Sequence, residues 1–373
     1  MVFSWKNLDY PVVLCPPMDG ITDNAFRELI ASFGGSSVLY CEFVNVKGLI
    51  YQNSKTLFEL RYTENQRPII AQLFGNDPND FFNAAQIIVK LGFDGIDINM
   101  GCPAHKVASK GSGCALMNKT DIAREIVRAS IEGAKIAAKE LKLAHDFEVS
   151  CKMRLGVDDK NKVLEHGIAM IEAGAKAIAI HGRTLKQMYS GHADWDVIRT
   201  FVQLKQHKYG DKVPVFGSGD VKSLYDAFVR ILTTGVDGVM IGRGSFGKPW
   251  IFDRSKVDLL RYYVHLVEQK LDKKSGYITL EEIEQLDNIN EIKLALENPS
   301  MSFDDIKSIV IRHARLMYDE KGDTGILQMR KHLGWYFHGF EGAKSLRSRL
   351  VRVKTLEEVE NALDSYSSNL QDE

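Results

Sequence analysis

The sequence predicts an α/β protein, a (β/α)8 or TIM barrel followed by a small all-helical C-terminal domain. Short apolar segments rich in β-branched residues recur eight times before Trp250, and longer segments with helical periodicity lie between them. After Trp250 the strand-like segments stop and only helical patterns continue. Eight strand–helix units over about 250 residues is the usual length of such a barrel.

The expected strands have a continuous apolar character, which is typical of parallel strands buried on both faces. They are residues 12–14, 37–41, 69–73, 95–99, 149–153, 177–181, 213–217 and 238–241. Helices are expected most clearly over 79–91, 121–141, 163–173 and 223–234, and glycines that stop helices follow at Gly92, Gly174 and Gly235. An open, doubly wound sheet is the alternative, since a count of strands does not exclude it.

Charge and periodicity divide the chain into three expected parts. Residues 1–255 form the catalytic barrel, 256–302 an acidic helical linker or insertion, and 303–373 a helical domain. Residues 263–302 contain eight acidic against four basic residues, whereas 303–354 contain eleven Lys or Arg against six Asp or Glu. Helices over 303–319, 325–337 and 355–367 would build the last part as a small bundle.

Composition argues against several classes of protein. The 373 residues carry a net charge of −1, which alone disfavours a dedicated nucleic-acid binder. The five cysteines form no CxxC pair and no metal-ligand spacing, so we expect free thiols in a reducing compartment and no metal. No apolar run reaches the length of a membrane span and Met1 opens no leader, so a cytoplasmic protein without membrane contact is expected. No obligate protein partner is evident.

Polar residues end or follow most of the expected strands, where a TIM barrel builds its active site. Each of them alone is more simply explained as a satisfied structural residue. Together they predict a polar pocket at one end of the barrel. They are residues 15–18, Gln72, 99–103, Lys152, Arg154, 181–183, 217–220 and 242–244.

The last two strands run into glycine-rich loops, GSGD at 217–220 and GRG at 242–244. Loops at these places in a TIM barrel often hold a phosphate, because glycine lets backbone N–H groups approach the anion. Two tight turns are the alternative. The pair of loops predicts a phosphorylated cofactor or substrate, with Arg243 adding positive charge. A Rossmann dinucleotide site is not indicated, since no GxGxxG follows the first strand.

Cys102 differs from the other cysteines by its position. Three of the others, Cys15, Cys41 and Cys151, lie in or at the ends of apolar strands, and Cys114 lies in a turn of small residues. The loop 102–113 after the fourth strand contains two lysines and a histidine, whose charges would lower a thiol pKa. We therefore expect a mobile active-site loop that carries a proton donor or a nucleophile.

Several motifs together resemble the flavin-dependent tRNA-dihydrouridine synthases, over about residues 11–252 and more weakly over the C-terminal helices. The most specific is DINMGCP at 97–103, with Lys106-Val107 and residues 111–117 following it. The others agree in order, spacing and content: CPPMDGITD at 15–23, AQLFG at 71–75, KMR at 152–154, HGRT at 181–184, YSGHADW at 189–195 and GRG at 242–244.

The resemblance implies FMN across the barrel mouth, reduced by NADPH or NADH. A cation at Lys152 suits the anionic reduced flavin, and a buried ion pair is the alternative. Ser218 stands where the family usually carries Asn and keeps a hydrogen-bonding group there. The implied contacts are Pro16, Pro17 and Met18 to the ring through the backbone, Gln72, Lys152 and His181 to the ring and ribityl chain, and Ser218, Gly219, Asp220, Gly242 and Arg243 around the phosphate.

By the same resemblance, hydride passes from flavin N5 to C6 of a uracil ring in tRNA and Cys102 protonates C5. Asn99 and Arg183 would face the base, and Lys106 would contact the RNA. The base must leave its stack to reach the flavin. Two other functions stay open, an FMN barrel acting on a free pyrimidine and a non-catalytic RNA-binding barrel.

The C-terminal helices carry a basic cluster with aromatic neighbours. Arg330, Lys331 and His332 precede an aromatic run at 335–337, and arginines follow at 347, 349 and 352. This composition suits an RNA backbone surface with stacking, and an amphipathic helix with a basic face and an aromatic core is the alternative. The resemblance favours tRNA binding by residues 303–373. The acidic stretch 272–302 looks longer than the family's usual connection, which leaves the docking geometry open.

Overall fold

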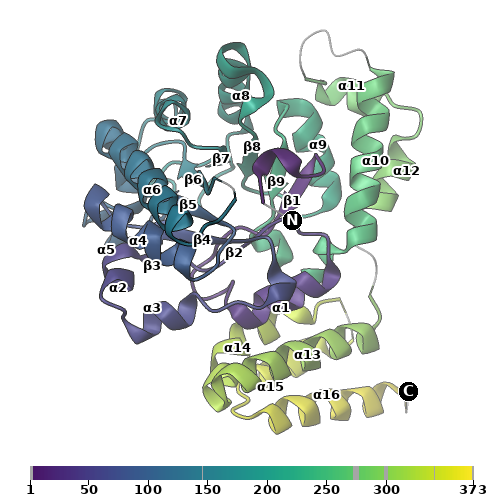
Figure 1. Ribbon diagram of the computed structural model, residues 1–373. Helices are drawn as coiled ribbons and strands as arrows, with labels where there is room; N and C mark the ends of the chain where they lie inside the picture. Colours follow the sequence, from purple (N-terminus) through teal and green to yellow (C-terminus); the bar gives the residue numbers. More distant parts are fainter. Residues whose placement is uncertain (1–2, 145, 272–276, 298–300, 340, 372–373) are drawn as a thin grey trace.

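The structure, a computed structural model, describes residues 3–144, 146–271, 277–297, 301–339 and 341–371. Eight parallel strands form a nearly closed barrel with helices around it, and a helical region follows (Figure 1). The TIM barrel is therefore confirmed. The strands, in their order around the barrel, are β1 Val12–Leu14, β9 Gly238–Met240, β8 Val215–Ser218, β7 Ala177–His181, β6 Glu148–Arg154, β5 Gly95–Met100, β4 Ile69–Phe74 and β2 Leu39–Tyr40.

The first and last strands pair with each other, which excludes the open sheet. Val12 to Leu14 of β1 lie in parallel register with Gly238 to Met240 of β9. On its other side β1 meets the segment before β2, where the Ser37 N–H donates to the Val13 carbonyl at 3.0 Å. β1 and β2 form no continuous ladder of hydrogen bonds with each other. At this one place the barrel is closed by an isolated hydrogen bond, from Ser37 to Val13.

All eight expected strands are present, two with the predicted ends and six with shifted ends. The second is shorter than predicted, and the seventh begins at Val215 because Pro214 has no N–H for the ladder. A further two-residue strand, β3 Val44–Asn45, pairs with β4 and was not predicted. It is too short to show an apolar period of its own, and its pairing is set by tertiary packing.

Helices follow most of the strands and form the outer ring, with glycines at several of their ends. Gly174 and Gly235 have φ of 113° and 71°, left-handed values that end their helices as predicted. Gly92, with φ of 80°, follows the fourth helix. The helices are α1 Asn24–Phe33, α2 Val46–Ile50, α3 Ser54–Glu59, α4 Pro78–Lys90, α5 His105–Ala108, α6 Thr120–Glu140, α7 Lys162–Ala173, α8 Trp195–Tyr209, α9 Leu224–Thr234 and α10 Arg254–Lys270.

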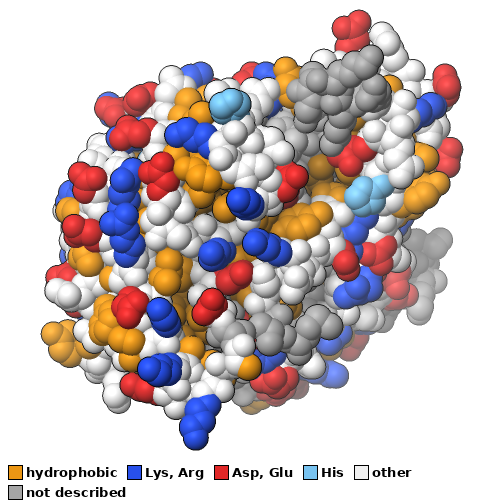
Figure 2. Space-filling model, turned by 45° about the horizontal axis from the view of Figure 1, so that its top comes forward, with side chains coloured by type: hydrophobic (Ala, Val, Ile, Leu, Met, Phe, Trp, Pro, Cys, Tyr) orange, Lys and Arg blue, Asp and Glu red, His pale blue; other side chains and the backbone are white. Residues whose placement is uncertain are grey.

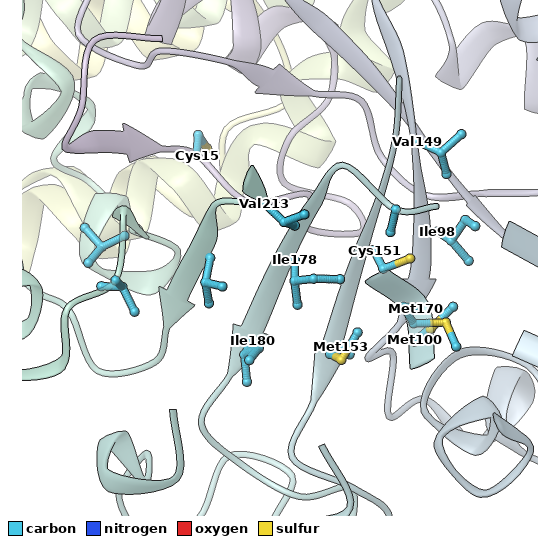
Figure 3. Packing of buried hydrophobic residues seen from close by; sticks show 14 of the residues in the cluster. Cys15, Ile98, Met100, Val149, Cys151, Met153, Met170, Ile178, Ile180 and Val213 are labelled. Carbon is cyan, nitrogen blue, oxygen red and sulfur yellow. The ribbon is translucent and has the colours of Figure 1, made fainter. Parts of the chain in front are cut away.

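The outward side chains of the strands build the core between barrel and helices. Ile98, Cys151 and Ile178 come from three neighbouring strands and lie in this layer, and Met100 lies against Met170 of α7 (Figure 3). All five are buried among apolar neighbours. Cys151 therefore acts as a small apolar side chain, as its strand position predicts.

The acidic segment after α10 packs on the barrel rather than hanging free. Two short helices, α11 Leu280–Glu284 and α12 Ile289–Leu296, bury Ile283, Ile292 and Leu296 in the same core as the barrel helices. Figure 1 shows both beside α10. Their acidic side chains lie outside, so the charge balance of this segment marks a solvated face. Residues 272–276 and 298–300 of the predicted insertion lie outside the described residues.

The C-terminal region is a bundle of α13 Phe303–Lys321, α14 Asp323–Tyr336, α15 Ala343–Leu350 and α16 Leu356–Gln371. Three of these helices were predicted. The bundle has its own apolar core, which also takes in Ala25 of α1 and Trp250 from the end of the barrel. Lys321 of α13 forms an ion pair with Asp23 at 2.6 Å, and both side chains are nearly buried. Bundle and barrel thus share an apolar and polar interface around α1.

Two buried histidines at this interface predict a loss of stability in acid. His313 and His332 pack on Phe26 of α1 with ring centroids 5.6 and 5.2 Å away. Burial lowers the pKa of His313 to about 4 and that of His332 well below its usual value. The unfolded chain binds these protons near pH 6.5, so it holds more protons than the folded chain below that pH. The free energy of unfolding should fall as pH drops from about 6.5 towards about 4.

Urea unfolding at several pH values tests this expectation. His332→Phe should weaken the acid dependence between pH 6.5 and 4, because one protonation site of the unfolded chain is gone. His207→Phe, which changes an exposed histidine on α8, should leave the dependence as in the parent protein. Equal acid dependence in His332→Phe and the parent would contradict the assignment.

Candidate active site at the carboxyl ends of the strands

Inward side chains of the barrel change from apolar to polar along the strands. Near the amino ends they form an apolar plug with Trp5 of the 3-10 helix η1 Trp5–Asn7, including Leu14, Ile70 and Phe216. Because successive side chains of a strand alternate faces, the later inward positions also lie inside the barrel. These are Gln72, Asp97, Asn99, Ser150, Lys152, Arg154, His181 and Ser218. Eight polar side chains, gathered at one end of the barrel, form a site rather than a core.

A chain of hydrogen bonds crosses three strands at this end. Ser150 Oγ and Gln72 Nε2 each donate to the Asp97 carboxylate at 2.7 Å. Asn99 Nδ2 donates to Gln72 Oε1 at 2.8 Å. Asn99 Oδ1 then accepts from the backbone N–H groups of Gly101 and Cys102, at 3.0 and 2.8 Å. The polar side chains below the barrel mouth are therefore mutually satisfied.

Lys152 and Asp97 are the charged pair of this network. Burial lowers the pKa of Lys152 to about 8, against the nearby Asp97 charge, which raises it. Burial likewise raises the pKa of Asp97 to about 6, against hydrogen bonds from Ser150 and Gln72 and the charge of Lys152. At neutral pH the network holds one negative and one positive group. Of these two residues, Asp97 is buried, whereas Lys152 is partly exposed at the mouth of the barrel.

The Cys102 thiol is buried, with 8% of the residue exposed. Burial raises its pKa above the usual value, outweighing Arg154 and Lys106, which lower it. The expectation of a lowered thiol pKa is therefore wrong: Lys106 of loop 102–113 does lower the pKa, but burial raises it by more. Lys106 is exposed and its Nζ lies 4.0 Å from Asp19 Oδ2, so its charge is directed to solvent and to a carboxylate. The thiol stays protonated at neutral pH, as a proton donor requires.

The loop that carries Cys102 is compact. It contains α5 and the 3-10 helix η3 Gly113–Asn118. The Cys114 N–H donates to the Cys102 carbonyl at 3.2 Å, and Gly113 has φ of 59°. A side chain at Gly113 would lie 3.0 Å from the Cys102 oxygen and 3.2 Å from its Cβ. This close approach explains the glycine and holds Cys102 at the barrel mouth.

The two glycine-rich loops meet around Asp220. Arg183 Nη2 donates to both oxygens of the Asp220 carboxylate, at 2.9 and 2.8 Å, and Arg243 Nη2 donates at 3.2 Å. Asp220 thus binds two guanidinium groups, of which that of Arg243, with a 52% exposed side chain, is the accessible one. Gly219 has φ of 121°, and a side chain there would lie 2.6 Å from Ala193 Cβ.

The loop after β1 reaches the loop after β9. A side chain at Gly242 would lie 3.4 Å from Met18 Sδ and from Pro16 Cγ. Pro16 is buried, whereas Pro17 and Met18 are partly exposed. The structure therefore brings the expected ring contacts of β1 next to the expected phosphate loop, although these segments are far apart in the sequence.

His181 is a neutral histidine at the same end. Burial, together with the charges of Lys152, Arg154, Arg183 and Arg243, lowers its pKa to about 2. Its Nε2 lies 3.5 Å from Arg183 Nη1. With four cations around it, the imidazole does not take up a proton near neutral pH, so it serves as a hydrogen-bonding group and not as an acid.

Arg183 and Asn99 are more buried than their expected substrate contacts require. Arg183 is 1% exposed and also donates to the carbonyls of Ser190 and Gly191. Asn99 is 6% exposed, and both ends of its amide are engaged. Contact of either side chain with a base stays a prediction, which for Asn99 rests on the remaining Nδ2 hydrogen.

Arg154 belongs to the polar pocket that the sequence predicts, although the sequence interpretation gave it no role. It donates to the carbonyls of Gly101, Thr184 and Met188 at 2.8 to 2.9 Å. Its guanidinium carbon and that of Arg243 lie 5.7 and 5.3 Å from the Tyr189 ring centre. Arg154 therefore ties the Cys102 loop to the loop after β7. Its inward position on β6, two residues after Lys152, was the signal for it.

The basic cluster of α14 does not form one surface. His332 is buried in the interface with α1, so it is not available to RNA, and this prediction is wrong. Arg330 donates to the carbonyls of Val353 and Arg352 and caps the end of α15. Tyr336 and Phe337 are buried in the bundle core, which favours the aromatic-core alternative. Lys331 is exposed and donates to the Gly20 carbonyl in the loop after β1.

Metal sites and membrane-spanning helices are both absent from the described part of the chain. Within the described ranges, no group of three or more His, Cys, Asp or Glu side chains could hold a metal ion. In the same part of the chain, no helix is long and apolar enough to cross a membrane. Figure 2 shows a face on which Lys and Arg side chains lie among Asp and Glu side chains, in keeping with the net charge of −1.

Fold and site together define a TIM-barrel protein with a polar, cation-rich pocket at the carboxyl ends of its strands. The chain matches the family described as Dihydrouridine synthase (Dus) over residues 13–371, and it belongs to that family. A probable tRNA-dihydrouridine synthase of Mycobacterium tuberculosis (strain CDC 1551 / Oshkosh) is 34% identical over 363 residues, 95% of this chain and 81% of that protein. The tRNA-dihydrouridine synthase B of Pseudomonas aeruginosa is 31% identical over 349 residues, 92% and 88% of the two chains.

Proposed function

We propose that this chain is a tRNA-dihydrouridine synthase that reduces the C5=C6 bond of a uridine in tRNA, with FMN as cofactor and NADPH as reductant. The observation that carries the proposal is family membership over residues 13–371, together with a protonated thiol at Cys102 and the partly exposed residue Lys152 at one barrel mouth. In this proposal residues 1–255 carry out catalysis, 256–302 connect, and 303–373 bind RNA.

The residues at the mouth fit FMN. The cradle at Gly219 and Gly242 leaves no room for a side chain at Gly219, and Arg243, 52% exposed at its side chain, supplies a cation there. Lys152, Gln72 and neutral His181 offer donors and acceptors for a ring edge and ribityl chain, and Ser218 for the phosphate. When bound, a flavin supplies the hydride. Lys152 would stabilise negative charge on the reduced ring.

Cys102 would protonate the uracil ring. Hydride addition at C6 leaves negative charge at C5 and O4, and a positioned acid must neutralise C5. Burial keeps the Cys102 thiol protonated at neutral pH, and Asn99 and Arg154 together hold the Gly101–Cys102 peptide group that precedes it. The thiol thus carries the proton at the mouth of the barrel, where a flipped base would enter.

The bundle would supply the RNA surface through side chains other than those first expected. Lys344, Arg349, Arg352 and Lys354 are exposed on and after α15. Lys331 reaches the loop after β1 and so connects the bundle to the barrel mouth. Phosphate contacts of this kind make affinity depend on salt, which is the expected behaviour of the full chain with tRNA.

Cofactor content tests the proposal. We expect the purified protein to be yellow and to release FMN on denaturation, identified by its mass. Gly219→Ala should lose most of the flavin, because a Cβ there would overlap Ala193 and strain a left-handed backbone. Gly210→Ala is the matched control, since Gly210 also has positive φ but has no atom within 4 Å of the added Cβ. A colourless protein that binds no added FMN would refute the proposed cofactor.

A further inference from the structure

The hydrogen-bond chain below the barrel mouth runs from Ser150 through Asp97, Gln72 and Asn99 to the backbone of Cys102. Its side chains are almost fully buried: Asp97 and Gln72 are each 1% exposed, Ser150 2% and Asn99 6%. The side-chain links measure 2.7, 2.7 and 2.8 Å, and the last link, from the Cys102 N–H, measures 2.8 Å. The chain therefore spans β6, β5 and β4 and ends on the residue that carries the thiol.

The Asp97 carboxylate gives this chain a direction. An ionised carboxylate only accepts hydrogen bonds, so Gln72 must turn its Nε2 towards Asp97 and its Oε1 towards Asn99. Asn99 must then present Nδ2 to Gln72 and Oδ1 to the N–H groups of Gly101 and Cys102. Turning either amide around would set like groups against each other at both of its ends. One acceptor-only group thus fixes two amides in series.

The same backbone is held from its other side. Arg154 Nε donates to the Gly101 carbonyl at 2.9 Å, and the Cys114 N–H donates to the Cys102 carbonyl at 3.2 Å. Both N–H groups of this turn are bound by Asn99, so the hydrogen-bond chain is what orients them. If the chain is broken below Asn99, Asn99 Nδ2 loses its acceptor, and the Asn99 side chain is held only by the two N–H groups that it orients.

We propose that Asp97 and Gln72 are positioning residues for Cys102, acting through Asn99 on the backbone that presents the thiol. Asp97 is not a catalytic residue, because its contacts run to protein groups below the mouth. Gln72 uses one amide hydrogen on Asp97 and its oxygen on Asn99, so its second amide hydrogen is the group left for the flavin of the proposed function. The role of the thiol as proton donor rests on the proposed function. Its placement by this chain does not, since the hydrogen bonds exist without flavin or RNA.

Alkylation of Cys102 tests the placement. The full chain as purified is treated with iodoacetamide, and the rate of Cys102 modification is followed by mass spectrometry of its peptide. The other four cysteines are buried, at 0 to 2% exposure, and serve as internal references. Gln72→Leu and Asp97→Leu should each raise the rate by about ten-fold, the effect expected for loss of one buried hydrogen bond that keeps a segment closed.

Two further variants separate positioning from general destabilisation. Asp97→Asn should stay within about two-fold of the parent rate, because its oxygen still accepts from Gln72 while its amide donates to Ser150, whose hydroxyl also accepts hydrogen bonds. Gln66→Leu makes the same change at another buried glutamine, 1% exposed and bound to Arg27 and Asn24, and should leave the rate unchanged.

The pH profile of alkylation gives a second measurement. In the parent protein, burial raises the thiol pKa. In Gln72→Leu the released thiol meets water, so the midpoint of its alkylation profile should move to lower pH. Unchanged rate and unchanged midpoint in folded Gln72→Leu would overturn the proposal, and Asp97→Leu decides in the same way if Gln72→Leu does not fold. Because Gln72 would also contact the flavin of the proposed function, parent and variants are compared at equal flavin content, and Asp97→Leu must show the same change. Since no turnover is measured, an error in the proposed function then does not alter this outcome.

Discussion

Cys102→Ala should keep its flavin and its fold but form dihydrouridine about 10²–10⁴-fold more slowly than the parent protein, the usual contribution of a positioned general acid. The Cys102 loop holds this thiol at the barrel mouth. Burial raises the pKa of the thiol, so it keeps its proton at neutral pH. The rate is measured as dihydrouridine formed per tRNA, by mass spectrometry of digested nucleosides.

Cys114→Ala is the matched control for this variant. Cys114 belongs to the same connection and its N–H supports Cys102, but its own thiol is fully buried and its Sγ contacts the Gly156 carbonyl at 3.6 Å. Alanine keeps the N–H, so activity should stay near that of the parent. A Cys102→Ala protein as active as Cys114→Ala would remove the thiol from the mechanism.

Arg183→Met should lower the free energy of unfolding by about 3–5 kcal/mol, the range for breaking a buried ion pair from one side. The Arg183 side chain is 2% exposed and donates to both oxygens of Asp220, and it also binds the carbonyls of Ser190 and Gly191. Methionine fills similar volume but leaves these acceptors without their donor. Urea unfolding at pH 7 measures the loss.

Arg243→Met separates buried from exposed charge at the same carboxylate. Arg243 also pairs with Asp220, at 3.2 Å, but its side chain is 52% exposed. Its removal should cost less than about 1 kcal/mol, as for exposed ion pairs. Equal losses in the two variants would show that the burial of Arg183 does not determine the stability of these loops.

Continuous apolar strands and glycine stops carried most of the fold prediction. Parallel strands buried on both faces leave this pattern in the sequence, and each predicted strand is present. The two-residue strand β3 and helix α15 were not predicted, because short elements are fixed by their tertiary neighbours more than by local pattern. The acidic segment was expected to be a helical linker or insertion, and its Ile283 and Ile292 are core residues. The overall charge of the segment gave no sign of this, because the acidic side chains lie on one face of its helices and the apolar ones on the other.

The site was predictable where position along a strand determines it. Position near the strand ends predicted that Cys102, Lys152 and His181 lie at one mouth of the barrel. The alternation of side chains along β5 and β6 also points Asp97 and Arg154 into the barrel. The direction of the Cys102 pKa shift was not predictable, because the burial that raises the pKa depends on how the loop packs, which the sequence does not show. His332 was misplaced for a related reason, since composition does not say which face of α14 meets the barrel.

The most direct test of the central claim is dihydrouridine formation by the purified, FMN-loaded protein. An unmodified tRNA transcript is incubated with the protein and NADPH, digested, and mapped by mass spectrometry. The proposal predicts a uridine that gains two hydrogens at a defined place in the RNA, only with NADPH and not with Cys102→Ala. Oxidation of NADPH without any reduced uridine in tRNA, or reduction of free uridine or uracil in its place, would contradict it.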